Sequence, residues 1–309
     1  MKSNFKSILF LLCAAMIWGF AFVAQDAASE HLGNFSINGL RSIIAFISIM
    51  IILLIKKITK KVKIFPESKQ DRKVLWFVSA LCGICFAVAY NLQQKGLAMY
   101  PDGVASSGRA GFLTGLYVVF VPIIGFIFFK KKIGLNNILS VILAFIGLYL
   151  LCFGDGFEKI YLGDFVLLPC SIFFALQIII VGKYSDRIEP LIFCALQLLI
   201  CGIISLVFAI PIEKPEIGNI VKAIFPLIFL GVFSCGVADL LQVYGQSFSN
   251  NPTVDSIIMS LESVFAIIGG FLFLGQIPGI KEIIGCIIMF GAIVLSQIEI
   301  KFKKTLPSE

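Results

Sequence analysis

Hydrophobic runs of about 20 residues recur along the chain from Ser7 to Gln297, separated by short polar stretches. A helical run of that length crosses roughly 30 Å of hydrocarbon, because each residue advances the helix by about 1.5 Å. The first run resembles a signal peptide, but the further runs behind it favour an uncleaved first helix. The pattern predicts ten transmembrane helices, at residues 7–25, 36–55, 74–94, 104–129, 137–153, 163–182, 190–210, 221–243, 254–274 and 280–298.

The composition predicts a membrane protein with no separate soluble domain. The 309 residues are 59% hydrophobic with a mean hydropathy of +1.01, and 14% are charged, whereas soluble domains are about 25% charged. The nine cysteines lie mostly inside the hydrophobic runs. Even Cys82 and Cys85, one helical turn apart on an apolar helix, are interpreted as reduced packing residues. The sequence therefore predicts no metal site and no cofactor.

Lysine and arginine gather in alternate connections between the hydrophobic runs, as basic residues do on the cytoplasmic side of a membrane. One set of connections and ends carries Lys2, Lys6, Lys56, Lys57, Lys60, Lys61, Lys63, Lys69, Arg72, Lys73, Lys130, Lys131, Lys132, Lys183, Arg187, Lys301, Lys303 and Lys304, and the other set carries Lys95, Lys159, Lys214, Lys222 and Lys281. This bias predicts a multi-pass protein of the cell membrane with both termini in the cytoplasm. The basic loop at 56–73 is interpreted as a topological anchor rather than a phosphoinositide or nucleic-acid patch, and no nucleic-acid partner is expected.

The first half of the chain recurs in the second half, which is a frequent sign of a transporter. At a separation of 149 residues, Val88, Ala89, Leu92, Gln93 and Gly96 match Val237, Ala238, Leu241, Gln242 and Gly245. At a separation of 145, Leu116, Val119, Phe120, Ile123, Gly125, Phe126, Phe128 and Gly134 match Leu261, Val264, Phe265, Ile268, Gly270, Phe271, Phe273 and Gly279. The matching glutamines, glycines and phenylalanines indicate two related repeats.

Each repeat holds five helices, an odd number, so the second repeat must enter the membrane in the opposite orientation. The sequence predicts an all-α integral membrane protein of ten transmembrane helices, in two inverted five-helix repeats around a central cavity. The first repeat is assigned to residues 1–153, a connecting loop to 154–162, the second repeat to 163–298 and a short cytoplasmic tail to 299–309. Inverted repeats allow two arrangements of similar energy, each closing one end of a path, which permits alternating access. A duplicated structural bundle without transport is the alternative.

Three segments are similar to those of one transporter family. The first run holds AAMIWGFAF at residues 14–22, the fourth holds GFLTGLYVVFVP at 111–122, and the ninth holds LESVFA at 261–266. On these segments, and from about Ser7 to Gln297, the chain resembles the EamA family of the drug/metabolite transporter superfamily. The resemblance implies a ten-helix transporter, in which the second and third segments end the pocket wall of each half.

The chain departs from the family's pattern at two positions. Ser263 stands where the family often has a proline after the glutamate, and Gln276 stands where it often has an acidic residue. The resemblance therefore implies the fold more closely than the cargo, which in this family ranges over amino acids, other metabolites and drugs.

Few ionisable side chains fall inside the predicted helices, where a charge costs about 3 kcal/mol unless it is paired or faces water. Glu262 lies near mid-membrane, and we hypothesise that it faces the cavity and meets a charged group of the cargo or carries a coupling proton. The alternative is that Glu262 pairs with an arginine and fixes helix packing. Arg41, which resembles a family-typical arginine, and Arg109 are candidates for charge pairing or coupling. Asp239 is interpreted as a polar residue at a helix end.

Aromatic and amide side chains supply the other candidates for substrate binding, because their flat faces and fixed donors bind organic solutes without leaving a charge unpaired. These candidates, with Glu262, are Trp18, Tyr90, Asn91, Gln93, Gln94, Tyr117, Gln177, Gln197 and Gln242. Tyr117 and Glu262 are counterparts in the two repeats, as are Gln93 and Gln242. We therefore expect each pair to line equivalent walls of one cavity.

Catalytic motifs are absent from the sequence: the single His31 lies in a loop, and no phosphate-binding glycine motif follows a strand. Without such a motif the chain is not expected to hydrolyse ATP, and no catalytic residue is assigned. The sequence predicts a secondary transporter of small organic metabolites by alternating access, and the resemblance implies export of amino acids or related metabolites.

Two alternatives belong to other classes. An intramembrane lipid-modifying enzyme would need Glu262, Arg41 and Asn91 to converge, and a channel or receptor would conduct or bind without carrying. The expected partners are a small organic solute and the lipid bilayer. Coupling to H⁺ and the choice between monomer and homodimer are left open by the sequence.

Overall fold

The computed structural model describes residues 5–60, 65–101, 106–130, 134–153, 160–249, 251–274 and 278–297. Every regular element in these ranges is a helix, as the hydrophobic pattern predicts. The helices are α1 (Phe5–Ser29), α2 (Asn34–Lys60), α3 (Lys69–Leu97), α4 (Ser106–Gly115), α5 (Tyr117–Phe129), α6 (Leu135–Phe153), α7 (Leu162–Tyr184), η1 (Ser185–Arg187), α8 (Pro190–Ile212), α9 (Ile217–Lys222), α10 (Ile224–Ile228), η2 (Phe229–Ala238), α11 (Asp239–Ser247), α12 (Pro252–Met259), α13 (Glu262–Leu274) and α14 (Ile280–Gln297).

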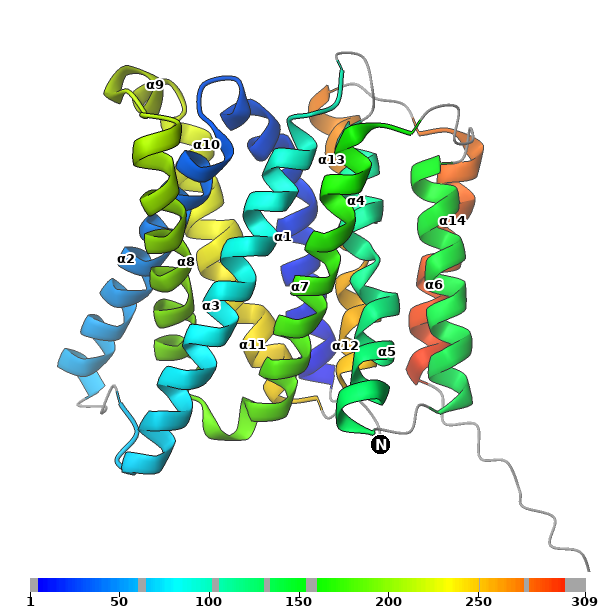
Figure 1. Ribbon diagram of the computed structural model, residues 1–309. Helices are drawn as coiled ribbons and strands as arrows, with labels where there is room; N and C mark the ends of the chain where they lie inside the picture. The colour runs from blue at the N-terminus through cyan, green and yellow to red at the C-terminus, as the bar shows by residue number, and fades with distance from the viewer. Residues whose placement is uncertain are drawn as a thin grey trace, which may run out of the picture.

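Within these described ranges, nine stretches are long and apolar enough to cross a membrane, and a shorter apolar helix covers Leu135–Leu150. Four of the nine are composite, because α4 with α5, α7 with η1, α10 with η2 and α11, and α12 with α13 each form one stretch. The stretches run alternately up and down (Figure 1). The protein is therefore a multi-pass membrane protein with the all-α architecture expected from its sequence.

Helix direction shows the inversion of the two halves (Figure 1). We call the edge where α1 begins the terminal edge, and the opposite edge, where α1 ends, the far edge. The first five spans begin with α1 running from the terminal edge to the far edge, and the next five begin with α7 running the other way. As a result, α14 ends at the terminal edge, on the side where α1 begins.

The two halves pack reciprocally around the centre. α3, the third span of the first half, packs along α7, the first span of the second half. The span at 224–247 packs in the same way along α1. Helices α2 and α8 form a further counterpart pair, and α6 and α14 form another at one side of the molecule (Figure 1).

Glycines allow the closest of these helix contacts. A Cβ atom added to Gly19 in α1 would lie 2.6 Å from the backbone oxygen of Glu262, the first residue of α13. A Cβ added to Gly245 in α11 would lie 2.7 Å from the side chain of Leu11 in α1. Small residues at these crossings therefore hold α1 against its two neighbours, as in many membrane bundles.

The fourth and ninth spans are interrupted, whereas the sequence predicted continuous helices at 104–129 and 254–274. α4 ends at Gly115 and α5 begins at Tyr117, while α12 ends at Met259 and α13 begins at Glu262. Tight hydrogen bonds to the third preceding residue mark each break, from Val119 N to Leu116 O at 2.9 Å and from Leu261 N to Ile258 O at 3.2 Å. The prediction of continuous helices was wrong because hydropathy does not detect a change of one turn.

The eighth span also departs from a regular α-helix, through the π-helical segment η2. A π-helix pairs residues five apart and commonly occurs near functional sites. In this segment the backbone oxygen of Ser234 accepts a hydrogen bond of 3.1 Å from the indole Nε1 of Trp18 in α1. The contact fixes the Trp18 ring at the centre of the bundle.

Candidate functional site: the central cavity

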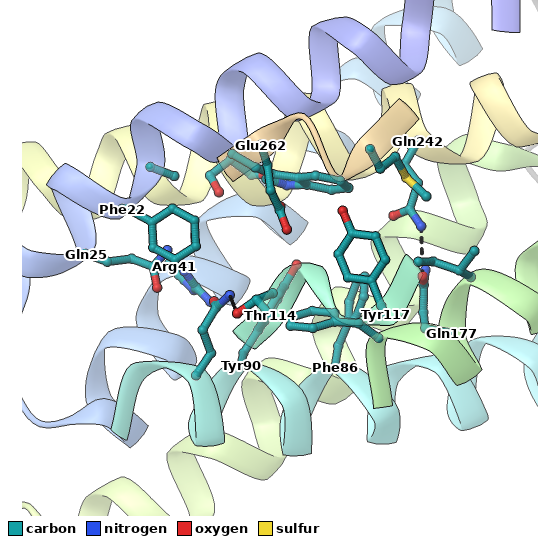
Figure 2. Close-up of a pocket in the computed structure, with 17 residues that line it drawn as sticks. Phe22, Gln25, Arg41, Phe86, Tyr90, Thr114, Tyr117, Gln177, Gln242 and Glu262 are labelled. Carbon is teal, nitrogen blue, oxygen red and sulfur yellow. Dashed lines mark hydrogen bonds between the residues drawn. The ribbon is translucent and has the colours of Figure 1, made fainter. Parts of the chain in front are cut away.

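A cavity lies between the two halves, where the interrupted spans meet α1, α2, α3, α7 and the span at 224–247. Eight of the residues that the sequence proposed line it: Trp18, Arg41, Tyr90, Gln93, Tyr117, Gln177, Gln242 and Glu262. Figure 2 shows Gln25 and Arg41 toward one end, Gln177 and Gln242 toward the other, and Glu262 between them. The cavity offers a volume of about 50 Å³ to the centres of water molecules, so it has room for a few waters.

Tyr117 and Glu262 occupy the middle of the cavity. Each is the first residue of the helix that follows a break, and the two are repeat counterparts. Figure 2 shows both side chains pointing into the cavity. They are buried, with 3% and 5% of their surface exposed, and neither the Tyr117 hydroxyl nor Glu262 Oε1 has a hydrogen-bond partner among the described residues. The two side chains interact electrostatically with each other, and neither atom is held by a standard hydrogen bond that a solute would have to displace.

Arg41, Tyr90 and Asp239 form a second polar group beside the cavity. The Tyr90 hydroxyl donates to both carboxylate oxygens of Asp239, at 3.2 and 3.0 Å. The guanidinium carbon of Arg41 lies 4.3 Å from the centre of the Tyr90 ring, a cation–π contact. Arg41 is 1% exposed, and its Nε and Nη2 atoms have no hydrogen-bond partner in the part of the chain that the structure describes.

The interpretation of Asp239 as a helix-end residue was wrong. Its side chain is fully buried, because the eighth span continues to Ser247 instead of ending at residue 243. Asp239 is the repeat counterpart of Tyr90, 149 residues away, so the twofold relation brings the two residues face to face. This signal was present in the sequence, in the run of matches around residue 90.

Amide side chains lie at both ends of the cavity. Toward the terminal edge, Gln242 Nε2 donates to Gln177 Oε1 at 2.9 Å (Figure 2), and Gln246 Nε2 donates to the backbone oxygen of Ile178 at 2.9 Å. Toward the far edge, Gln93 Nε2 donates to Thr114 Oγ1 at 3.1 Å. Each end thus carries buried amide hydrogen bonds between different helices.

Two proposed substrate-binding residues do not line the cavity. Asn91 donates to Ser205 Oγ at 2.8 Å and accepts from Asn38 Nδ2 at 3.1 Å, so it joins α3 to α8 and α2. Gln94 donates to the backbone oxygen of Gln25 at 3.2 Å. Asn91 turns away from the cavity, toward α2 and α8, whereas Gln94 lies one helical turn after Tyr90 and contacts α1 just beyond the cavity lining. Gln197 is also buried outside it.

Arg109 lies outside the cavity, near the far edge. It forms an ion pair with Asp164 of α7, with Nη2 to Oδ2 at 2.7 Å and Nε to Oδ1 at 3.3 Å. The Tyr100 hydroxyl donates to the same carboxylate at 2.6 Å. Burial and this hydrogen bond raise the pKa of Tyr100, so that its hydroxyl remains a donor. The cluster joins α4, α7 and the end of α3, and the bidentate pair favours a positioning role.

Several cavity residues escaped sequence reasoning. They are Ala21, Phe22, Gln25, Phe86, Thr114, Phe174, Ile178, Ser234 and Met259. Phe22 and Gln25 stand 152 residues before Phe174 and Gln177, so a comparison of the first helix with the sixth identifies both pairs. The small or apolar residues carry no comparable signal, because the same types also face lipid.

The arrangement does not form the cluster that a lipid-modifying enzyme would need. Arg41 and Glu262 share the cavity, but Asn91 is held outside it. In the described ranges no group of three metal-ligating side chains comes together, and no arginine pairs with Glu262. The structure therefore does not bring together the arginine and Glu262 that the packing alternative would pair.

These observations define the class: a multi-pass membrane protein with two related halves around one buried, polar and aromatic cavity. The sequence profile of the EamA-like transporter family matches residues 5–153 and 161–297. The chain therefore belongs to the EamA-like transporter family, and it is a membrane transporter.

Named relatives and a solved structure agree with this assignment. An uncharacterized transporter of Archaeoglobus fulgidus is 28% identical over 94% of this chain and 85% of its own length. Protein PagO of Salmonella typhimurium is 24% identical over 84% of this chain and 82% of its own. A protein crystal structure superposes with a TM-score of 0.75 at 12% identity, covering 94% of this chain and 98% of that one. The superposition shows the shared fold.

Proposed function

We propose that this transporter carries a small organic metabolite through the central cavity by alternating access, without ATP hydrolysis. The observation that carries the proposal is the pair of buried charged residues, Arg41 and Glu262, which line one cavity between two inverted halves with hydrogen-bonding atoms unpartnered in the described structure. A charge at membrane depth costs about 3 kcal/mol when nothing compensates it. A solute that presents the opposite charges removes part of this cost when it binds.

The chemistry of the cavity favours a zwitterion of amino-acid type. Glu262 can accept from an ammonium group, with the unpartnered Tyr117 hydroxyl beside it. Arg41 can donate to a carboxylate from Nε and Nη2. Phe22, Phe86 and Phe174 supply apolar walls for a side chain. We propose that an amino acid or a related metabolite is the cargo and that the direction is export.

Coupling and topology complete the proposal. Glu262 is buried without a cation in contact among the described residues, so it binds either a proton or the cationic group of the cargo. A coupling proton can occupy this carboxyl whether the cavity is open to one edge or to the other. The basic residues of the terminal-edge connections support a topology with both ends of the chain in the cytoplasm, and we propose the cell membrane as the location.

Flux into liposomes that contain the purified protein tests the proposal. The panel contains an amino acid, its amide, the corresponding acid without the amine, and a neutral sugar. The amino acid is expected to move faster than in protein-free vesicles and faster than the other three. Folded protein that moves no member of the panel contradicts the proposal.

Two variants separate the proposed contacts. Arg41→Gln is expected to reduce the preference for the amino acid over its amide, because it removes the partner of the carboxylate. Glu262→Gln is expected to reduce the preference over the acid that lacks the amine. If both variants change all four rates equally, the two residues do not recognise charge.

A further inference from the structure

Side chains that occupy equivalent places in the two repeats lie at the two ends of the cavity. Gln25 and Phe22 of α1 stand 152 residues before Gln177 and Phe174 of α7. Gln93 of α3 stands 149 residues before Gln242 of α11. The inverted relation therefore puts one set of amides near the far edge, on α1 and α3, and the other near the terminal edge, on α7 and α11 (Figures 1 and 2).

Each set joins helices from opposite sides of the cavity. On one side α1 packs along the span at 224–247, and on the other side α3 packs along α7. The far-edge contact joins α3 to α1, where Gln94 Nε2 donates to the backbone oxygen of Gln25 at 3.2 Å. The terminal-edge contact joins α11 to α7, where Gln246 Nε2 donates to the backbone oxygen of Ile178 at 2.9 Å. The accepting oxygens belong to positions that are equivalent within one residue.

The terminal-edge contact has a second bond, from Gln242 Nε2 to Gln177 Oε1 at 2.9 Å. The six glutamines at the two ends are all buried, with at most 6% of their surface exposed: Gln25, Gln93, Gln94, Gln177, Gln242 and Gln246. The cavity between them has room for only a few waters. Buried amide contacts therefore narrow both ends of the cavity in this conformation, and a solute larger than a few waters reaches Glu262 only when one contact opens.

We infer that these amides form two clasps, a far clasp of Gln25, Gln93 and Gln94 and a terminal clasp of Gln177, Gln242 and Gln246, which open in turn. The inference rests on the proposed transport function and assigns the residues that control access to each edge. Hydrogen bonds of neutral amide side chains suit this role. Each contributes a net stabilisation of about 1 kcal/mol, which is small enough for the bond to break and re-form in each transport cycle. Two clasps of similar chemistry leave the two open states close in free energy.

Hydrogen–deuterium exchange of the full-length protein in detergent tests the inference without any cargo. Gln177→Leu is expected to raise the exchange rate about twofold to tenfold at residues 178–184 and 239–247, because the loss of one hydrogen bond favours opening there. Gln94→Leu is expected to raise it by a similar factor at residues 22–29 and 91–97. Each variant leaves the opposite edge unchanged or slower.

Gln197→Leu is the matched control, because Gln197 is fully buried and neither of its side-chain polar atoms has a hydrogen-bond partner among the described residues. Faster exchange at both edges in every variant, or an equal effect of Gln197→Leu, overturns the inference. If Gln177→Leu does not fold, Gln246→Leu removes the other bond of the terminal clasp. Flux without these shifts refutes the clasps alone, whereas shifts without flux leave the clasps and refute the proposed cargo.

Discussion

Two tyrosines face two carboxyl groups near the twofold axis that relates the repeats. Tyr90 and Asp239 are counterparts, as are Tyr117 and Glu262, because residues close to such an axis meet their own equivalents across it. The Tyr90 hydroxyl is hydrogen-bonded to Asp239, whereas the Tyr117 hydroxyl and Glu262 Oε1 have no partner in the described structure. The first pair is therefore hydrogen-bonded within itself, whereas Tyr117 and Glu262 interact without a standard hydrogen bond at these two atoms, which a solute can contact.

This difference predicts opposite effects of removing the two hydroxyls. Tyr90→Phe leaves a buried carboxylate without its donor, so the free energy of unfolding is expected to fall by about 1–3 kcal/mol. Tyr117→Phe removes a hydroxyl that makes no hydrogen bond in the described structure, and stability is expected to change little. Thermal unfolding in detergent measures both. Equal melting temperatures for the two variants would contradict the distinction between the pairs.

Glu262→Gln is expected to abolish or re-specify transport while the melting temperature in detergent stays nearly unchanged. The amide has nearly the same shape, but it is neutral and carries an NH2 donor in place of one acceptor oxygen. No cation among the described residues depends on the lost charge. Flux in liposomes and thermal unfolding, measured on the same preparation, check the two halves of the prediction. A variant that fails to fold would show that Glu262 is structural.

Element packing at the centre depends on the close approach of α1 to α13. Gly19→Ala adds a Cβ atom 2.6 Å from the backbone oxygen of Glu262, too close for either helix to remain in place. We expect a loss of stability of roughly 1–3 kcal/mol and a weaker response to the cargo, because Glu262 moves with α13. Gly291→Ala is the control, since its Cβ would meet nothing within 4 Å. Equal melting temperatures for the two variants would exclude tight packing at Gly19.

Hydrophobic length predicted the helices well but not their interruptions. The breaks before Tyr117 and Glu262 involve a single turn, and no proline follows Glu262 to reveal the second one. The π-helical segment around Ser234 is likewise invisible to hydropathy. Paired interruptions in the two halves of a transporter often mark its binding site, and here they place Tyr117 and Glu262 at the centre of the cavity.

The candidate site was predicted where the sequence carried chemistry or a repeat match. Glu262, Gln93 and Gln242 were identified in this way, and they line the cavity. The sequence could not exclude Asn91 from the site. Which face of α3 turns toward the cavity depends on how the helix is oriented about its axis, and packing determines that orientation. Phe22 was not predicted as a cavity residue, because phenylalanine also occurs on helix faces that contact lipid.

At the scale of the whole molecule, each half supplies what the other half needs. The third span of each repeat packs along the first span of the other, so neither repeat encloses the cavity alone. Because the spans of the two repeats pack against each other in this way, Arg41 from the first repeat and Glu262 from the second lie in one cavity. The site is therefore a property of the pair of repeats, and the proposed alternating access predicts a rocking motion between them that changes access from one edge to the other.

Counterflow in liposomes tests alternating access most directly. Vesicles that contain the protein are loaded with unlabelled amino acid, and a trace of the labelled amino acid is added outside. A carrier that exposes one cavity to each edge in turn predicts a transient accumulation of label above its equilibrium level, which Glu262→Gln abolishes. Label that enters only down its own gradient, at a rate independent of the internal amino acid, would contradict the account.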